Sequence, residues 1–465
     1  MTKQSAKLLG GALAALVAGA AAWFGGLPHD ACWTATITTL CAVYWVTEAL
    51  PIPATSLIPF AVLPLTGVLD HRTVAASYGH HLILLLLGGF ILSKAVEGSG
   101  VHRRLALGMV RAFGGFGRRG LVLGFMAATA LSSMWISNTA TVLMLLPIAL
   151  AILADEDARD LTVPLLLGIA FAASIGGVGT PIGTPPNVVC VGIYEARTGV
   201  RISFVEWMSW GVPFVVAFVP VAWFWLTRGV RHGPAPVVPD QGAWRRHERR
   251  VLVVFALTAA AWIFRTNPAG GWTALLGLGE HVGGSWRAAA GDETVALAAV
   301  VAMFVLPNGS GGRLLTWEQA KEIPWGLLLL FGGGLSIAAA FEASGLSEIV
   351  GGALEGVAGG PIIVVTLVIC LVVTFATELT SNTATTTLLM PILCSAAIAA
   401  NVEPRLLMVP AAISASCAFM MPVATAPNAV VFGTGEIPIQ RMVRAGLVLN
   451  LVGAVIATAV SVTML

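Results

Sequence analysis

The tripeptide Ser-Asn-Thr occurs twice in this chain, at residues 137–139 and 381–383, each time in the middle of an apolar stretch. Polar, non-helical backbone is tolerated at membrane depth only where it is buried in protein or lines a wet cavity, so both positions indicate a ligand. Their hydroxyl and amide oxygens, together with freed backbone carbonyls, can form a small cage of neutral oxygens. Because Ca²⁺ and Mg²⁺ usually recruit carboxylates, such a cage favours a monovalent cation, and we expect sodium.

Two further breaks carry the pattern Thr-x-Pro-Asn, at residues 184–187 and 425–428, and a glycine-rich run that begins at Gly176 leads into the first. No Lys or Arg lies near the middle of these segments or of the Ser-Asn-Thr stretches. A bound carboxylate would therefore be neutralised by bound cations and by positive helix ends. Two equivalent Ser-Asn-Thr segments also suit a substrate with a carboxylate at each end, so the residues predict cation-coupled binding of a small dicarboxylate.

The composition identifies the class of protein that holds these segments. Of the 465 residues, 57% are apolar and only 10% are charged, and the mean hydropathy is +0.88. Soluble domains contain about 25% charged residues, so this composition is that of a membrane protein in contact with lipid. The net charge of +2 says nothing about nucleic acid, and we expect no nucleic-acid partner.

Apolar runs of about 17 to 25 residues, the length that crosses a bilayer core, recur along the whole chain. The predicted spans lie near 8–26, 32–50, 52–69, 81–97, 162–194, 209–228, 250–265, 291–307, 324–341, 406–432 and 445–465. Two longer apolar stretches, 120–154 and 361–400, are each interrupted by a polar cluster and are expected to form re-entrant helical hairpins. The predicted fold is an all-α polytopic membrane protein with these 11 transmembrane helices and two hairpins.

The distribution of basic residues predicts the orientation. With a cytoplasmic N-terminus and two re-entrant hairpins, the inside segments hold 18 of the 25 Lys and Arg residues, the outside segments hold 6, and Lys94 remains at a span end. Such a bias is typical of cytoplasmic loops. If either hairpin were a single crossing, every later loop would change sides and the bias would be lost.

Three blocks of sequence recur in the same order in the two halves. Gly88-Gly89 with Glu97 matches Gly333-Gly334 with Glu342 at an offset of 245, the Ser-Asn-Thr segments match at 244, and the Thr-x-Pro-Asn segments match at 241. The charge bias places the entry of the first hairpin inside and that of the second outside. The halves are therefore predicted to be inverted repeats with broken helices, the architecture of secondary transporters with a midplane site.

These features together resemble the divalent anion:sodium symporters, over essentially the whole chain from Thr47-Glu48-Ala49-Leu50-Pro51 to the second Thr-x-Pro-Asn segment. The resemblance implies at least two sodium ions, one held by Ser133, Ser137, Asn138 and Gly183 and the other by Thr377, Thr380, Asn382 and Ala424. It implies substrate contacts from Asn138, Thr139, Thr184, Pro185, Asn382, Thr383, Thr425 and Ala426. One departure is that Ala426 occupies the position that Pro185 has in the first repeat.

The resemblance further implies an elevator mechanism in a homodimer in a bacterial inner membrane. The expected domains are scaffold helices in 1–119, a transport unit with hairpin, broken helix and helix 6 in 120–230, a cytoplasmic linker at 231–249, scaffold helices in 250–360 and a second transport unit in 361–465. The expected substrates are C4-dicarboxylates such as succinate, malate and fumarate. A sodium-independent exchanger and a citrate or sulfate symporter remain open on the same scaffold.

Other classes of protein fit less well. A channel does not require two cation cages that flank an anion site. An intramembrane enzyme is disfavoured because no hydroxyl nucleophile has a His or Lys partner within a span, and the eight histidines fall in loops or at span ends. The six cysteines are expected to be buried free thiols. Glu378, next to the second Ser-Asn-Thr segment, is equally compatible with a functional role and with bracing of the hairpin tip.

Overall fold

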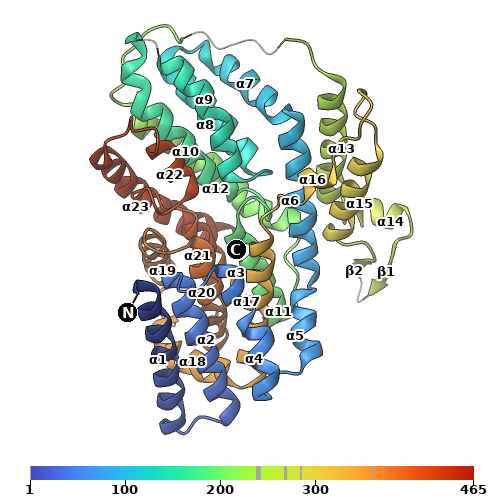
Figure 1. Cartoon of the computed structure of the whole chain (residues 1–465), viewed down its shortest axis with the longest axis vertical. Helices are drawn as coiled ribbons and strands as arrows, with labels where there is room; N and C mark the ends of the chain where they lie inside the picture. The colour runs from blue at the N-terminus through green and yellow to red at the C-terminus, as the bar shows by residue number, and fades with distance from the viewer. Residues whose placement is uncertain (1, 155, 237–241, 267–269, 283–284, 359) are drawn as a thin grey trace.

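The computed structural model describes residues 2–154, 156–236, 242–266, 270–282, 285–358 and 360–465, which are predominantly helical. The first half contains α1 (Lys3–Phe24), α2 (His29–Thr47), α3 (Ile52–Thr55), α4 (Ile58–Thr66), α5 (His71–Tyr78), α6 (His81–Ser99), α7 (Val101–Gly114), α8 (Gly117–Ser133), α9 (Asn138–Leu153), η1 (Glu156–Leu161), α10 (Thr162–Gly177), α11 (Pro185–Thr198) and α12 (Phe204–Thr227) (Figure 1). The second half contains α13 (Arg246–Ile263), α14 (Gly271–Leu275), β1 (Gly279–Val282), β2 (Ser285–Ala288), α15 (Asp292–Val305), α16 (Trp317–Ala320), α17 (Trp325–Ala343), α18 (Leu346–Ala358), α19 (Ile362–Thr377), α20 (Asn382–Ala399), α21 (Arg405–Ala415), α22 (Ala426–Phe432) and α23 (Ile439–Met464).

The predicted polytopic helical class is confirmed. Within the described residues, the segments long and apolar enough to cross a membrane are Lys3–Phe24, His71–Ser99, Ala158–Gly177, Phe204–Thr227, Trp325–Ala343, Asn382–Ala399 and Ile439–Met464. Shorter apolar helices include the hairpin arms α9 and α19, each of 16 residues. At 1.5 Å per residue such an arm rises about 24 Å, less than the roughly 30 Å of a bilayer core. Arms of this length are consistent with re-entrant hairpins.

Both hairpins and both broken helices form where the polar clusters predicted them. The hairpins are α8–α9 and α19–α20, and their tips lie immediately before Asn138 and Asn382, where the second arms begin. The broken helices are α10–α11 and α21–α22. In each, an extended threonine, Thr184 or Thr425, precedes the second segment, and a proline lies in the first turn of that segment. A proline is accommodated there because the first-turn N–H groups have no intrahelical partner.

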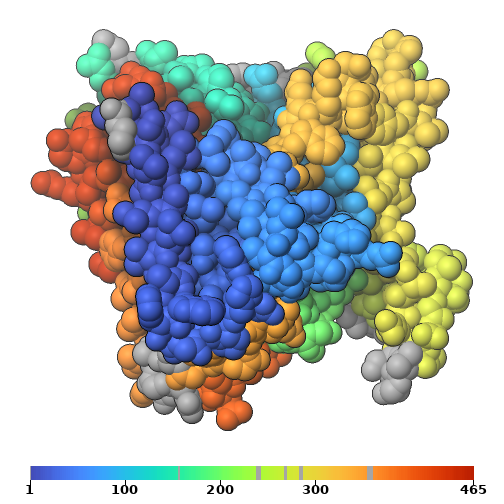
Figure 2. All heavy atoms as spheres, turned by 60° about the horizontal axis from the view of Figure 1, so that its bottom comes forward, coloured from blue at the N-terminus to red at the C-terminus, as the bar shows by residue number. Residues whose placement is uncertain are grey.

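The two halves repeat each other in their packing. Helix α8 packs on α10 and α12, and α19 packs in the same way on α21 and α23. Contacts between the halves are also paired, because α9 packs on α22 while α20 packs on α11, and α6 packs on α15 while α17 packs on α4. Figure 2 shows the blue N-terminal helices directly against orange helices of the second half. The halves are therefore interlocked around a common centre.

Some elements have no counterpart among the predicted spans. Helices α7 and α18 follow α6 and α17 as amphipathic segments, whose apolar residues recur at helical spacing but are too sparse for a span. The antiparallel hairpin β1–β2, with Gly279 opposite Ala288, stands out to one side of the molecule beside α14 (Figures 1 and 2). In the predicted linker 231–249, residues 237–241 lie outside the described residues.

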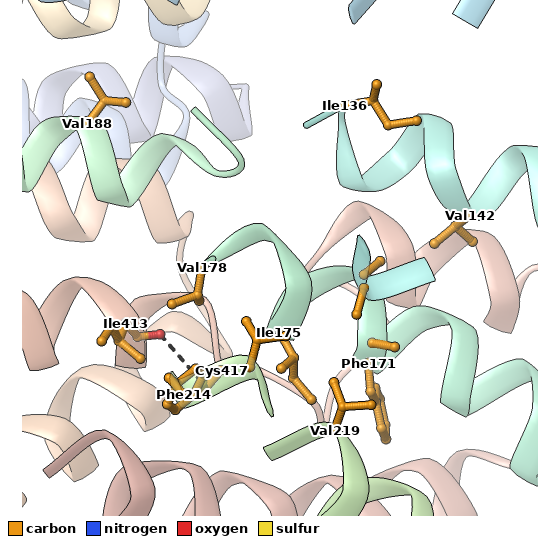
Figure 3. Close-up of a cluster of buried hydrophobic side chains, with 14 of the residues drawn as sticks. Ile136, Val142, Phe171, Ile175, Val178, Val188, Phe214, Val219, Ile413 and Cys417 are labelled. Carbon is orange, nitrogen blue, oxygen red and sulfur yellow. Dashed lines mark hydrogen bonds between the residues drawn. The ribbon is translucent and has the colours of Figure 1, made fainter. Parts of the chain in front are cut away.

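The largest hydrophobic cluster extends through both halves and includes the packing between the two broken helices. Ile175 and Val178 from the first break region meet Ile413 and Cys417 from the second, with Phe214 of α12 beside them (Figure 3). The Cys417 thiol donates to the Ile413 carbonyl at 3.4 Å. All six cysteines are buried free thiols, as predicted. This packing holds the non-helical segments of both breaks at fixed positions.

Candidate transport site

A cavity of about 970 Å³ lies where the hairpin tips and the breaks meet. The predicted site residues on its wall are Ser137, Asn138, Thr139, Gly183, Thr184, Pro185, Thr380, Asn382, Ala424, Thr425 and Ala426. Three predicted residues, Ser133, Thr377 and Thr383, are instead buried behind this wall. The structure therefore gathers two segments from each half, more than 240 residues apart in the sequence, around one volume.

Four helices begin at this cavity. Helices α9, α11, α20 and α22 start with Asn138, Pro185, Asn382 and Ala426, and all four of these residues line the wall. Each helix N-terminus carries about half a positive elementary charge and unsatisfied N–H groups. Because α22 has only seven residues, its dipole is weaker than those of the other three helices, which have 14 to 18 residues. Converging N-termini make this volume suitable for an anion.

The first predicted cation cage is compact. The Ser133 hydroxyl donates to the Asn138 side-chain oxygen at 2.5 Å and lies 2.7 Å from the Ala173 carbonyl. A methyl group added at Gly177 would lie 2.8 Å from the same Asn138 oxygen and 3.1 Å from the Gly183 carbonyl. Two glycines thus leave room in which hydroxyl, amide and carbonyl oxygens converge. Helix C-termini and unwound carbonyls of this kind coordinate sodium in transporters with broken helices.

The second predicted cage has different internal contacts. The Asn382 side-chain oxygen accepts from the backbone N–H of Thr383 at 2.7 Å, and the Thr377 hydroxyl donates to the Thr374 carbonyl at 3.0 Å. The Thr380 hydroxyl lies 2.7 Å from that of Thr385. These oxygens are therefore engaged within their own hairpin. Thr377 and Ala424 replace Ser133 and Gly183 of the first cage, so the two cages differ in both residue type and local geometry.

Asparagines of the two Thr-x-Pro-Asn segments brace the breaks in the same way. The Asn187 amide donates to the carbonyls of Gly177 and Thr180 at 3.0 and 2.7 Å, and the Asn428 amide donates to Ala418 and Met421 at 3.0 and 3.1 Å. Both asparagines are fully buried. Each amide donates hydrogen bonds to backbone carbonyls that would accept from backbone N–H groups if the helix were continuous. This role was not predicted, although the repeated asparagine was the signal for it.

Glu378 also has a bracing role. One carboxylate oxygen accepts from the Met420 N–H at 2.8 Å and from the Asn450 amide at 2.7 Å, and the other accepts from the Met421 N–H at 2.9 Å. The residue is 4% exposed. Because Asn450 lies on α23, this carboxylate ties the second hairpin to both the break and α23. Of the two roles predicted for Glu378, the structure supports bracing.

Three buried hydroxyls on the cavity wall have no hydrogen-bond partner within the described residues. They belong to Ser174, Thr184 and Ser416. Buried polar groups in native proteins are nearly always paired, so unpaired hydroxyls at a cavity indicate water, an ion or a substrate group as their partner. Ser174 and Ser416 were missed by the sequence analysis, because single serines next to the breaks carry no distinctive pattern.

Charged side chains reach the cavity from the ends of α2 and α6 and from the segment before α17. The basic residue on its wall is Lys94, and the carboxylates are Glu48, Glu97 and Glu322. No group of three or more His, Cys, Asp or Glu that could hold a metal ion occurs in the described part of the chain. The part of the wall that the described residues of the tips and breaks supply is therefore lined by neutral oxygens, helix ends and apolar groups.

A cluster of charged groups also lies outside the cavity, in the loop before α21. Burial acts to raise the pKa of Glu403, but hydrogen bonds from the Tyr194 hydroxyl and the Arg405 guanidinium, both 2.9 Å long, outweigh it and hold the pKa below its usual value. Arg405 also pairs with Glu206 of α12 at 2.8 Å. This cluster links α11, α12 and α21.

These elements define a multi-pass membrane transporter rather than an enzyme. The chain belongs to the citrate transporter family, whose profile matches residues 42–412, and this confirms the resemblance to the divalent anion:sodium symporters. It is 40% identical to the sodium-dependent dicarboxylate transporter SdcS of Staphylococcus saprophyticus, over 90% of this chain and 83% of that protein. It is 38% identical to SdcS of Staphylococcus aureus, over 92% of this chain and 85% of that protein.

Two solved structures share the fold at low sequence identity. The YdaH transporter of Alcanivorax borkumensis superposes with a TM-score of 0.61 at 16% identity, covering 93% of this chain and 98% of that one. MtrF of Neisseria gonorrhoeae, from a class of antimetabolite efflux pumps, superposes with a TM-score of 0.60 at 14% identity, covering 94% of both chains. These likenesses support the transporter fold alone.

Proposed function

We propose that this protein is a secondary active transporter that couples sodium to the uptake of C4-dicarboxylates such as succinate, malate and fumarate across a bacterial inner membrane. The observation that carries the proposal is the convergence of four helix N-termini and two oxygen-rich tips on one cavity. The sodium dependence and dicarboxylate substrates named for the two SdcS relatives agree with it.

The electrostatics of the cavity explain the coupling. Lys94 is the only Lys or Arg among the described residues on the wall, and it comes from α6 and not from a tip or a break. Helix ends supply partial charges whose effect falls off within the first turn, so they do not replace full counter-charges at both carboxylates. Sodium ions at the cage of Ser133, Asn138 and Gly183, and at the second cage around Asn382, supply the remaining field. The anion therefore binds well only after the cations, which is the basis of symport.

The same proposal includes an elevator movement in a homodimer. Helices α8–α12 and α19–α23 form the transport domain, and α1–α7 with α13–α18 form the scaffold. Glu48, Lys94, Glu97 and Glu322 lie near span ends that the charge bias assigns to the cytoplasm, which supports an inward-open conformation. On the opposite side, the polar contacts between scaffold and transport domain include His81 with Glu195 at 3.2 Å, Glu293 with Arg201 at 2.9 Å and Ser347 with Arg197 at 2.5 Å.

The test is uptake of radiolabelled succinate into proteoliposomes with sodium or choline outside, competed by malate, fumarate, citrate and sulfate. We expect saturable, sodium-dependent uptake that the C4-dicarboxylates compete. Replacing Asn138 or Asn382 with Ala should reduce uptake at least about tenfold, because each change removes a cage ligand and a substrate contact together. Thr463→Ala, at the exposed end of α23, is the control for reconstitution.

The same experiment separates the alternatives. Equal uptake in choline, with stimulation by succinate loaded inside the liposomes, would identify a sodium-independent exchanger. Stronger competition by citrate or sulfate than by malate would identify another anion on the same scaffold. Uptake without saturation would identify a channel. Wild-type behaviour of both Asn variants would remove the site assignment.

A further inference from the structure

A second large cavity, of about 1260 Å³, lies away from the transport site and shares no lining residue with it. It is formed by the ends of α9 and α12 and the beginnings of α10 and α23, so both halves contribute. Four arginines line it: Arg159 and Arg228 from the first half, and Arg441 and Arg444 from the second. We refer to it as the arginine cavity.

The charge of this cavity favours an anion. Among the described lining residues, the acidic ones are Asp160 and Glu436. Asp160 is already engaged, because the Arg118 guanidinium pairs with one oxygen at 2.6 Å and the Arg231 N–H donates to the other at 2.9 Å. Arginine stays protonated at every physiological pH, so four permanent positive charges face two negative ones. The planar guanidinium also matches phosphate oxygens with two parallel hydrogen bonds.

The remaining wall is apolar. Leu150 and Leu153 come from α9, Val163 from α10, and Trp225 and Leu226 from α12, and each is partly exposed. The Arg228 guanidinium lies 3.3 Å from the centre of the Trp225 ring, a cation–π contact that holds the charge at the border of the apolar surface. A small soluble anion would make no favourable contact with this apolar surface. A lipid can bind with its phosphate headgroup at the arginines and its acyl chain along the apolar wall.

We propose that the arginine cavity binds the phosphate headgroup of an anionic phospholipid, with an acyl chain along the leucines and Trp225. Basic pockets between the ends of transmembrane helices are typical places for such headgroups. A phosphate there bridges Arg159 or Arg228 to Arg441 and Arg444, and so ties the loop before α10 to the start of α23. Bound lipid therefore stabilises the packing of the two halves at this end of the molecule.

The experiment counts bound lipid by native mass spectrometry and measures thermal unfolding in a neutral detergent. The probes are phosphatidylglycerol, phosphatidylcholine and inorganic phosphate. We expect phosphatidylglycerol to bind and to raise the unfolding temperature, and the other two to do neither. The double variant Arg441→Gln/Arg444→Gln should bind phosphatidylglycerol at least about tenfold more weakly, because two charge-assisted contacts are lost. Arg441→Lys/Arg444→Lys, which keeps the charge but loses the paired geometry, should retain part of the binding.

The matched control is Arg103→Gln/Arg249→Gln, which removes the same charge from two exposed arginines outside the cavity. This control should bind lipid as the unchanged protein does. Equal loss in both double variants would show general attraction to a basic surface and would overturn the proposal. Stabilisation by inorganic phosphate as strong as by phosphatidylglycerol would assign the cavity to a soluble anion instead. Full binding by the Arg441→Gln/Arg444→Gln variant would also refute the site.

Discussion

Lys94 and Glu97 form an ion pair on the wall of the central cavity, with the ammonium nitrogen 3.0 Å from a carboxylate oxygen. Both side chains are partly exposed, and the Ser93 hydroxyl donates to the other oxygen of Glu97 at 3.4 Å. An unpaired Lys94 on this wall would attract a dianion. We infer that the pair with Glu97 weakens this attraction and so favours release of the substrate.

The first prediction follows from this pair. Replacing Glu97 with Gln should lower the half-saturating internal succinate concentration for efflux up to about fivefold, the range of an exposed ion pair, and should slow maximal efflux. The measurement is succinate efflux from preloaded proteoliposomes. The double variant Lys94→Gln/Glu97→Gln should return both values close to those of the unchanged protein. If the double variant resembles Glu97→Gln, the effect does not pass through Lys94.

The second prediction concerns the first cation cage. Gly177→Ala adds a methyl group 2.8 Å from the Asn138 oxygen and 3.1 Å from the Gly183 carbonyl, where it fills the space for an ion. Sodium should then stimulate succinate uptake at least about tenfold less, because the loss of one charge-assisted ligand contact has that order of effect. Gly108→Ala, which meets nothing within 4 Å, is the control. Unchanged sodium dependence in Gly177→Ala would place the cation elsewhere.

The third prediction concerns the Glu378 brace. Replacing Glu378 with Gln keeps one side-chain oxygen but places an amide N–H₂ group opposite backbone N–H donors, so at least one hydrogen bond is lost. Hydrogen bonds to a buried charged group are worth about 1.5 to 3 kcal/mol. We expect a lower unfolding temperature of the purified protein, with transport reduced in proportion to the folded fraction. Glu342→Gln, at an exposed span end, should leave stability unchanged. Lost transport with unchanged stability would instead indicate a direct role for Glu378.

The fourth prediction tests the orientation. All six native cysteines are buried, so the unmodified protein should react little with an impermeant thiol reagent. Gly108→Cys on α7 should be shielded in intact cells, because the 18-to-6 bias of basic residues places this helix inside. Val200→Cys, between α11 and α12 and 53% exposed, should react from outside. Labelling of Gly108→Cys from outside would overturn the first re-entrant hairpin and the inverted repeat.

The fifth prediction concerns substrate charge. Carboxyl groups of this kind titrate between about pH 4 and 6, so the fraction of fully ionised succinate rises between pH 5.5 and 7.5. Because cations and helix ends at the tips favour a dianion, the apparent affinity for succinate at saturating sodium should rise over this range. Citrate, whose dianion becomes scarcer over the same range, should show the opposite trend if it is carried in that form. Tighter binding of succinate at pH 5.5 would reveal a protonated substrate or a coupled proton.

The fold could be predicted because its determinants are local or periodic. Span length follows from apolar run length, and the inverted repeat follows from duplicated motifs and the charge bias. The helix starts at Asn138 and Asn382 and at Pro185 and Ala426 follow from cap residues and prolines, which act within one turn. Helices α7 and α18 were missed because amphipathic segments beside a membrane lack the apolar run that marks a span.

The candidate site could be predicted only in outline. The sequence identified 11 residues that do line the cavity, yet it could not place Ser133, Thr377 and Thr383 behind the wall. Exposure to the cavity depends on how each hairpin is rotated against its neighbours. That rotation is set by packing with helices far away in the chain.

The sequence by itself determined a membrane protein of two inverted halves, the segments that form its site and the absence of a fixed cation beside the tips, because these depend on residue type and spacing. Only the tertiary structure decided which distant groups meet: Glu378 with Asn450, Lys94 with the transport cavity, and Arg228 with Arg441 around the arginine cavity. It also decided that the two cages differ in their internal hydrogen bonds although the Ser-Asn-Thr motif is common to both. The physical reason is that duplicated motifs fix identical local backbone, whereas side-chain contacts depend on the neighbours that the rest of the fold supplies.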